Sequence, residues 1–428
     1  MRNRRAWIYV LMFLLAAINY IDRSALSVSA APLSKEFGLD PVQLGYLFSS
    51  FLWLYVICLV PMGLIVDRFG ARTTNAVGIA VWSTATILTG LVSSYTALIG
   101  TRLLMGAGEA TTYPAAGRVV REWIPIQERA LFTTIFNSGA YFGPAIGGLV
   151  LAWVAAEAGW RATFYVSGGI GFIWLAAWLI WFRRPEHARW LTAEERTHIL
   201  DNRAEPGTTS VQEPAIGLAG LLRFPAMLGM MLTQGCAVYT QYLFLTWLPT
   251  YLQNERGITL AKSGLLIALP YFTAVILTIL LGKLSDRLLT PAAVHSGARR
   301  RMVAAAMLLA AVLLLAPLLT GIGSILVLIT IALAGVATTV GLNIALLSDL
   351  LRSEPDAGRA TGLLILGGNV FGILAPIITG YVIQATGRFD AAFLVAGVLL
   401  VIGALSALFL TRHPIGLPTP SAHRPATP

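Results

Sequence analysis

The sequence predicts an all-α integral membrane protein whose twelve transmembrane helices form two six-helix bundles. Of its 428 residues, 57% are hydrophobic and only 12% are charged, and the mean hydropathy is +0.74, far above that of water-soluble proteins. Apolar stretches of roughly 20 residues, the length that spans a bilayer, recur along the chain. The two halves of the chain also share short sequence repeats.

The predicted spans are separated by short polar connections that hold nearly all the charge. The first six lie near 7–29, 44–66, 73–93, 96–117, 130–154 and 162–182. The second six lie near 226–252, 259–282, 302–320, 323–348, 360–382 and 391–411.

The basic residues predict the orientation in the membrane. With the N-terminus inside, the cytoplasmic segments hold 23 Lys and Arg residues and the outside loops hold 5. This is the positive-inside pattern, so the net charge of +10 reflects topology and does not indicate a nucleic-acid partner. The first apolar segment is too long for a signal peptide and is predicted to remain as a helix. We expect a multi-pass protein of the cell inner membrane with both termini in the cytoplasm.

The longest polar segment divides the chain into domains. We predict an N-terminal bundle over 1–182, a cytoplasmic linker over 183–220, a C-terminal bundle over 221–412 and a cytoplasmic tail over 413–428. In the linker, WLTAEER at 190–196 predicts a short amphipathic helix. The run after it, rich in Pro, Gly, Ser and Thr, predicts a flexible connection.

Internal repeats favour a duplicated six-helix unit. AGEATT at 107–112 recurs as AGVATT at 334–339, and GLIVDR at 63–68 resembles GKLSDR at 282–287. We interpret the small residues in these repeats as positions where helices pack closely. The second copy lacks the acidic residue of the first, Glu109, so the first half holds charge that the second half does not.

Four charged residues lie well inside predicted spans: Asp22, Arg23, Arg102 and Glu109. Each costs about 2.5 to 3.5 kcal/mol on insertion scales, which by default marks a functional site. Arg102 and Glu109 are seven residues apart, so both can face one cavity. Two interpretations stay open. Either these residues are ion pairs that fasten the first helix to the fourth, or they are an anion-binding arginine beside carboxylates that change protonation state.

Composition and motifs exclude several functions. Cys58 and Cys236 both fall in apolar spans and predict neither a disulfide framework nor a metal site. The sequence has no GxxxxGK[ST] stretch, so we expect no ATPase. It also has no histidine-rich metal set, no Gly-x-Ser-x-Gly turn and no acidic pair at helical spacing. We therefore expect no enzyme and no cofactor, with a proton gradient as the energy source, although a non-transporting sensor stays open.

GLIVDRFGAR at 63–72 resembles the loop signature GxxxDRxGxR of the major facilitator superfamily at every fixed position, and the resemblance extends over essentially the whole chain. It implies two bundles around a central cavity near the midplane that alternate access. It also implies a charge network that steadies the outward-facing state. The implied gating residues are Gly63, Asp67, Arg68, Gly70 and Arg72.

Five further stretches resemble the anion:cation symporters of that superfamily, the galactonate, glucarate and phthalate type. They are NYIDRS at 19–24, FSSFLWLY at 48–55, GEATTYP at 108–114, WLTAEE at 190–195 and FLTWLPTYL at 244–252. The resemblance implies that Arg23 meets the substrate carboxylate, with Tyr20 and Tyr55 nearby, and that Glu109 carries the proton. It further implies that Asp22 and Arg102 form a switching pair, and that Gln234 and Asn369 face the far end of the substrate.

The sequence departs from the sugar-acid members at Leu59, Ala140 and Ile365, where those members often have glutamine or asparagine. A polyhydroxylated substrate would leave many polar groups unpaired in such a pocket. We therefore expect proton-coupled import of a small carboxylate, sulfonated acid or aromatic acid with few hydroxyls, by a monomer. The alternatives are a sugar-acid symporter and a proton-linked antiporter of the drug-efflux type, which GAYFGPAIGG at 139–148 resembles.

Overall fold

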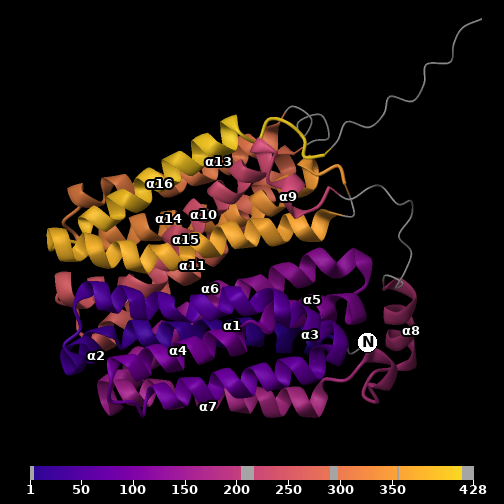
Figure 1. Ribbon diagram of the computed structural model, residues 1–428, viewed down its shortest axis with the longest axis horizontal. Coiled ribbons are helices and arrows are strands. Elements are labelled where there is room, and N and C mark those ends of the chain that lie inside the picture. The colour runs from indigo at the N-terminus through magenta and orange to yellow at the C-terminus, as the bar shows by residue number, and fades with distance from the viewer. Residues whose placement is uncertain (1–3, 204–215, 290–296, 354–355, 417–428) are drawn as a thin grey trace, which may run out of the picture.

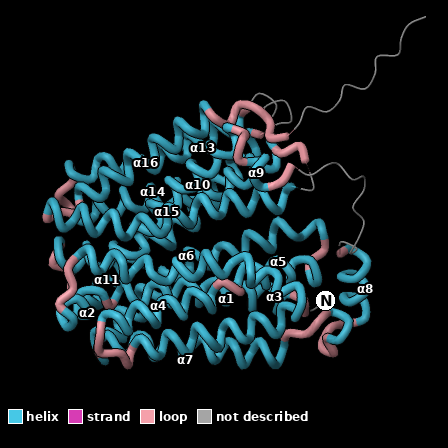
Figure 2. The backbone as a smooth tube through the Cα atoms, in the orientation of Figure 1, coloured by secondary structure: helices cyan, strands magenta, loops and turns pink. Residues whose placement is uncertain are grey.

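The computed structural model describes residues 4–203, 216–289, 297–353 and 356–416. Within these residues the regular elements are helices, apart from one isolated parallel bridge. Figure 2 shows the helices as cyan tubes that run mostly along the long axis of the molecule. The prediction of an all-helical protein is confirmed.

The helices of the first half form the lower part of the molecule in Figure 1. They are α1 (Ala6–Val28), α2 (Ala30–Phe37), α3 (Pro41–Thr89), α4 (Tyr95–Glu109), α5 (Thr112–Trp123), the 3-10 turn η1 (Ile126–Glu128), α6 (Arg129–Ala158) and α7 (Trp160–Trp181). The turn η2 (Pro185–His187) and α8 (Ala193–Asn202) follow at the end of the molecule where the N-terminus lies.

Most helices of the second half form the upper part in Figure 1, in rose to yellow. They are α9 (Leu218–Leu221), α10 (Pro225–Thr250), the π-helical turn η3 (Tyr251–Glu255), α11 (Leu260–Leu288), α13 (Ala298–Ala310), the 3-10 helix η4 (Ala311–Leu318), α14 (Ile322–Leu350), α15 (Ala357–Thr386) and α16 (Asp390–Phe409).

The described helices fit a twelve-span fold. Nine of them are long and apolar enough to cross a membrane. One of these, α3, is 49 residues long and holds two spans that meet at Gly70, whose φ of 84° and ψ of 158° only glycine adopts readily. The helices α4 and α5 together make another crossing, and α10 makes one more. The predicted twelve-helix architecture therefore agrees with the structure.

Several predicted boundaries differ from the structure. The spans expected at 44–66 and 73–93 are joined without a loop, because the intervening residues stay helical on both sides of Gly70. The span expected at 96–117 is broken after Glu109. The predicted amphipathic helix begins later, at Ala193, where Thr192 and Glu195 form a capping box. The flexible connection predicted after it falls on residues outside the described ranges.

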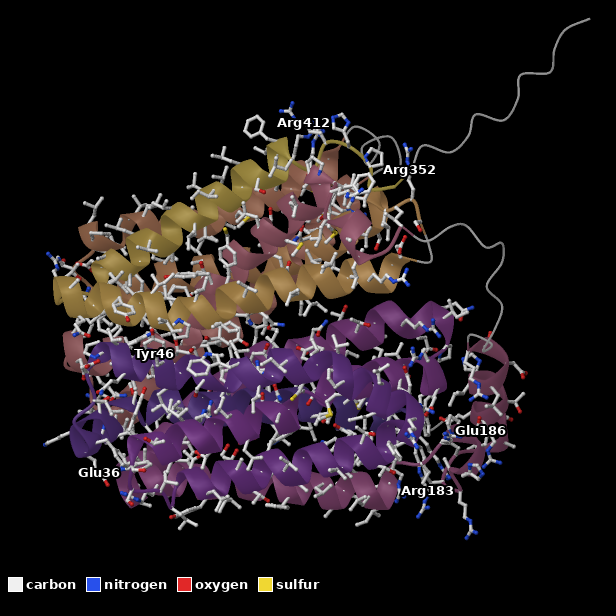
Figure 3. All side chains as sticks on the ribbon, viewed as in Figure 1. Glu36, Tyr46, Arg183, Glu186, Arg352 and Arg412 are labelled. Atoms are coloured by element: carbon white, nitrogen blue, oxygen red, sulfur yellow. The ribbon has the colours of Figure 1, made fainter. Side chains whose placement is uncertain are left out.

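The two halves meet at the end of the molecule that carries Glu36, here called the closed end (Figure 3). The hydroxyls of Tyr46 on α3 and Tyr381 on α15 lie 3.4 Å apart there. Glycine makes this contact close, because a Cβ on Gly45 would lie 2.5 Å from the Pro376 carbonyl oxygen. The two helices therefore touch through their backbones, as small residues permit in a membrane.

A second contact between the halves joins α6 to α11. The rings of Phe142 and Phe272 meet edge to face, with centroids 5.8 Å apart, and Gly264 lies against the Gly148 backbone. Among the described residues, the hydrogen bonds that join the halves are those of Tyr46 with Tyr381 and of an internal arginine described below. Figure 3 shows charged side chains, including Arg183 and Arg352, at the opposite end.

Candidate functional site

An ion pair between Arg23 and Glu109 lies at the centre of the first half. The Nε and Nη2 atoms of Arg23 on α1 donate to Oε2 of Glu109 at 3.0 and 2.8 Å. The side chains are only 3% and 0% exposed. Two N–H groups on one carboxylate oxygen make a strong, charge-assisted contact that holds α1 against α4.

The local chain buries Glu109 at a helix end. Glu109 is the last residue of α4, and Thr112 starts α5 after a short break. Two glycines let α4 pack closely against α3. A Cβ on Gly108 would lie 2.8 Å from the Trp82 nitrogen, and Gly106 packs against the Phe51 backbone. The GEATT stretch therefore both approaches α3 closely and presents a carboxylate to the interior.

Aromatic rings surround the Arg23 guanidinium. Its carbon lies 4.7 Å from the ring centre of Tyr20, 4.9 Å from that of Phe51 and 5.5 Å from that of Tyr55. Such distances permit cation–π attraction, which strengthens away from water. The expected proximity of Tyr20 and Tyr55 to Arg23 is present in the structure.

The second half reaches this site through Tyr242. Nη1 of Arg23 donates to the Tyr242 hydroxyl at 2.9 Å, and the Tyr242 ring stacks near Phe51 with centroids 6.3 Å apart. Tyr242 was not among the residues singled out from the sequence, because a tyrosine in an apolar span carries no charge to mark it. Its position makes Arg23 a contact between the two halves.

Asp22 and Arg102 are both buried but do not pair with each other. The Ser167 hydroxyl on α7 donates to Oδ1 of Asp22. Arg102 instead donates to the Met105 sulfur at 2.8 Å and lies 5.4 Å from the Phe51 ring centre. Adjacent helical residues point about 100° apart, so Asp22 faces α7 when Arg23 faces α4. The structure therefore does not bring the expected switching pair into contact.

The two polar candidates of the second half differ in their surroundings. Oε1 of Gln234 on α10 accepts a 3.0 Å hydrogen bond from Nδ2 of Asn343 on α14. Asn369 on α15 is half-buried and makes no side-chain hydrogen bond to the described residues. Asn343 is a residue that the sequence reasoning missed, although an asparagine in the middle of an apolar span is a usable signal.

The three apolar departures lie in different environments. Ala140 is 8% exposed and Ile365 is 38% exposed, while Leu59 is half-buried. None of the three side chains can form hydrogen bonds, so they add no polar partner to the interior.

The predicted gating residues bond within the first half. The Asp67 carboxylate pairs with Arg121 at 3.0 Å, and Arg72 donates to the carbonyls of Phe182 and Leu179 at 2.9 and 2.6 Å. Arg68 lies over the Phe69 ring, 5.2 Å from its centre. Gly63 has no heavy atom within 4 Å of an added Cβ, and Gly70 is the kink of α3.

These features define a helical membrane transporter with two halves and a buried arginine between them. The chain belongs to the Major Facilitator Superfamily, whose sequence model matches residues 12–297 and 289–428. The proposed fold and the resemblance drawn from the sequence are confirmed by this match.

Similar proteins include named transporters of organic acids. The probable galactarate/D-glucarate transporter GudP of Escherichia coli strain K12 is 33% identical over 422 residues, covering 95% of this chain and 93% of that protein. The D-galactonate transporter of Escherichia coli O6:H1 is 31% identical, covering 95% and 96%. The probable sulfoacetate transporter SauU of Cupriavidus necator is 31% identical, covering 95% and 94%.

Solved structures share the fold at low sequence identity. A bacterial homologue of the human lysosomal transporter Spinster, in an inward-facing and occupied conformation, has a TM-score of 0.73 at 18% identity and covers 96% of this chain and 98% of its own. A D-xylose-proton symporter has a TM-score of 0.70 at 14% identity, covering 95% and 98%.

Proposed function

We propose that this chain imports a small organic anion with few hydroxyls, together with protons, across the cell inner membrane. The observation that carries the proposal is the bond of Glu109 to Arg23. Glu109 occupies the Nε and Nη2 edge of the guanidinium, the edge that a substrate carboxylate or sulfonate would also bind.

Competition for that edge couples the proton to the anion. While Glu109 is ionised, it neutralises Arg23 and keeps the substrate out. A proton on Glu109 removes that charge and frees the guanidinium, which then needs another anion, because an unpaired buried charge is costly. Anion and proton therefore load together, and neither is stable in the site without the other.

The surroundings of Arg23 favour an apolar or compact anion. The side chains of Tyr20, Phe51 and Tyr55 surround Arg23 mainly with apolar ring surfaces and supply few polar atoms. Leu59 and Ala140, which the resemblance places in the pocket, add no polar atom either. A relative named as a sulfoacetate transporter is consistent with such a substrate, whereas relatives named for galactarate and galactonate support a sugar acid as the alternative.

The remaining charges serve the conformational cycle in this proposal. The halves touch at the closed end, and the predicted topology places the charged opposite end in the cytoplasm. Asp22 and Arg102 would pair when the halves rock to the other state, and Asp67 would then hold the cytoplasmic side shut. The protein would act as a monomer.

Uptake by proteoliposomes tests the proposal. Labelled sulfoacetate, benzoate, acetate and galactarate are offered under an inward proton gradient to the wild type, Arg23→Ala and Glu109→Gln. We expect accumulation of a compact anion, its loss in Arg23→Ala, and exchange without accumulation in Glu109→Gln. The matched control is Glu157→Gln, which changes an exposed carboxylate at the end of α6.

The same proteoliposomes, tested with a cationic drug as well as the four anions, separate the alternatives. Preferred accumulation of galactarate would establish a sugar-acid symporter. Proton-driven movement of a cationic drug in the outward direction would establish an antiporter. An uptake rate that changes neither with the proton gradient nor with the Arg23→Ala substitution would refute proton symport.

A further inference from the structure

A buried amide pair in the second half has one possible hydrogen-bond direction. Asn343 is 0% exposed, and its Nδ2 atom lies 3.1 Å from the Met230 carbonyl oxygen and 3.0 Å from Oε1 of Gln234. An amide NH2 group has two donors and a backbone carbonyl only accepts. Both Asn343 donors are therefore used, one on each neighbour.

This arrangement fixes the orientation of Gln234 by elimination. If the Asn343 amide were turned over, its oxygen would face the Met230 carbonyl, and two acceptors would oppose each other. With Asn343 held in this way, Gln234 must present an acceptor to it, so its Oε1 faces Asn343. The Gln234 NH2 group is then directed away from Asn343, and no described residue accepts from it.

Gln234 lies on the face of α10 that turns toward α15 and the first half. A Cβ on Gly368 of α15 would lie 3.3 Å from Cγ of Gln234, and one on Gly372 would lie 3.1 Å from the Tyr242 ring. Leu52 of α3 also approaches Gly372, at 3.4 Å from the same Cβ position. Gln234 is therefore on the same side of α10 as Tyr242, the residue that binds Arg23.

We propose that Asn343 is a positioning residue that makes Gln234 a hydrogen-bond donor to the substrate. Resting on the proposed function, this narrows the substrate class to organic anions that carry a second hydrogen-bond acceptor remote from the group held by Arg23. A carbonyl, a second carboxylate or a sulfonate meets that requirement. An alkyl tail does not, and it would leave the Gln234 donors without a partner, which a buried site penalises.

Three anions of one chain length test the proposal. Pentanoate has no acceptor besides its carboxylate, 4-oxopentanoate adds an acceptor, and 4-hydroxypentanoate adds a group that both donates and accepts. Affinity is measured by equilibrium binding to purified protein in detergent, so the result does not depend on transport. For the wild type we expect 4-oxopentanoate to bind roughly tenfold more tightly than pentanoate.

Two substitutions assign the effect to the amide pair. Gln234→Met keeps the length of the side chain and removes both donors, so 4-oxopentanoate should lose its advantage over pentanoate. Asn343→Leu releases Gln234 to rotate, so 4-oxopentanoate and 4-hydroxypentanoate should bind alike. Pentanoate should bind each variant as it binds the wild type, which shows that the variant is folded.

The outcomes distinguish this inference from the proposed function. Equal wild-type affinity for pentanoate and 4-oxopentanoate, with both lost in Arg23→Ala, would overturn the role of Asn343 and leave the anion site standing. A 4-oxopentanoate advantage that persists in Gln234→Met would overturn it too. Binding of all three anions that is indifferent to Arg23→Ala would refute the anion site itself.

Discussion

Arg23 and Tyr242 join the two halves of the protein by a hydrogen bond of 2.9 Å between the guanidinium Nη1 and the phenol oxygen. The bond crosses from α1 to α10 inside the membrane-spanning region. Arg23 is bonded both to Glu109 in its own half and to Tyr242 in the opposite half. A substrate that displaces Glu109 from Arg23 therefore also alters the hydrogen bond between Arg23 and Tyr242.

Tyr242→Phe removes this bond and keeps the ring. A hydrogen bond to a charged group contributes about 1.5 to 3 kcal/mol, so we expect substrate affinity in an uptake assay to fall at least about tenfold. Tyr271→Phe is the matched control, since its buried hydroxyl has no hydrogen-bond partner among the described residues. An equal loss in both variants would indicate general damage to packing.

Gly45→Leu should hold the closed end apart. The Pro376 carbonyl already lies where a larger side chain would go, and backbone atoms cannot give way without moving α15. We expect uptake to be abolished and spin labels on the two sides of the closed end to move apart in distance measurements. Gly100→Ala on α4, where an added Cβ meets nothing within 4 Å, should leave both readouts unchanged.

Asp22 and Arg102 should show coupling in function, although they do not touch in this structure. If they pair only in the opposite state, Asp22→Asn and Arg102→Gln should each slow uptake, and the double variant should be no slower than either one. A double-mutant cycle on the transport rate measures this. Strictly additive losses would show that the two residues act independently.

Asp356 at the start of α15 should stabilise the protein in a pH-dependent way. It accepts hydrogen bonds from the backbone of Ile216 and Gly217 and from the side chains of Ser353 and Arg359. Burial raises the pKa of Asp356, but these bonds outweigh it and hold the pKa below its usual 3.8. A carboxylate whose pKa is lower in the folded protein than in the unfolded chain stabilises the fold at pH values above the unfolded-chain pKa. This stabilisation is lost as the pH falls to the pKa of the folded protein.

Asp356→Asn should therefore reduce the free energy of unfolding by about 1 to 3 kcal/mol at pH 7. Thermal unfolding in detergent measures the difference, which should persist down to pH 5 and shrink below about pH 4, because there the carboxylate is protonated in the unfolded chain before it is protonated in the folded protein. Asp201→Asn, an exposed change on α8, is the control. A difference that stays constant to pH 3 would argue against an ionised clamp.

Much of the fold could be predicted because bilayer thickness sets helix length, and hydropathy marks it directly. Element ends were less predictable, because Gly70 lets one helix run into the next where a loop was expected. The charged residues of the site stood out by their cost in a membrane. The sequence did not show which of them form an ion pair. The rotation of α1 about its axis directs Arg23 toward Glu109 and Asp22 toward Ser167, so Glu109 pairs with an arginine and Asp22 does not.

Uncharged contributors were harder to find. Tyr242 and Asn343 come from the second half, where the repeat carries no intramembrane charge to draw attention. Their importance arises from contacts between helices far apart in the sequence. Hydropathy and motif spacing do not encode such contacts, so only the packed structure identified them.

The four internal charges of the first half also determine what the membrane voltage can do. Arg23 with ionised Glu109 is neutral, and Arg23 holding a monovalent anion beside protonated Glu109 is neutral again, while Asp22 and Arg102 cancel. Neither the empty nor the loaded carrier would then move net charge across the bilayer, so an electrical potential would do no work on either. Accumulation of a monovalent anion should follow the pH difference alone, and collapsing the voltage with potassium and valinomycin should leave it intact.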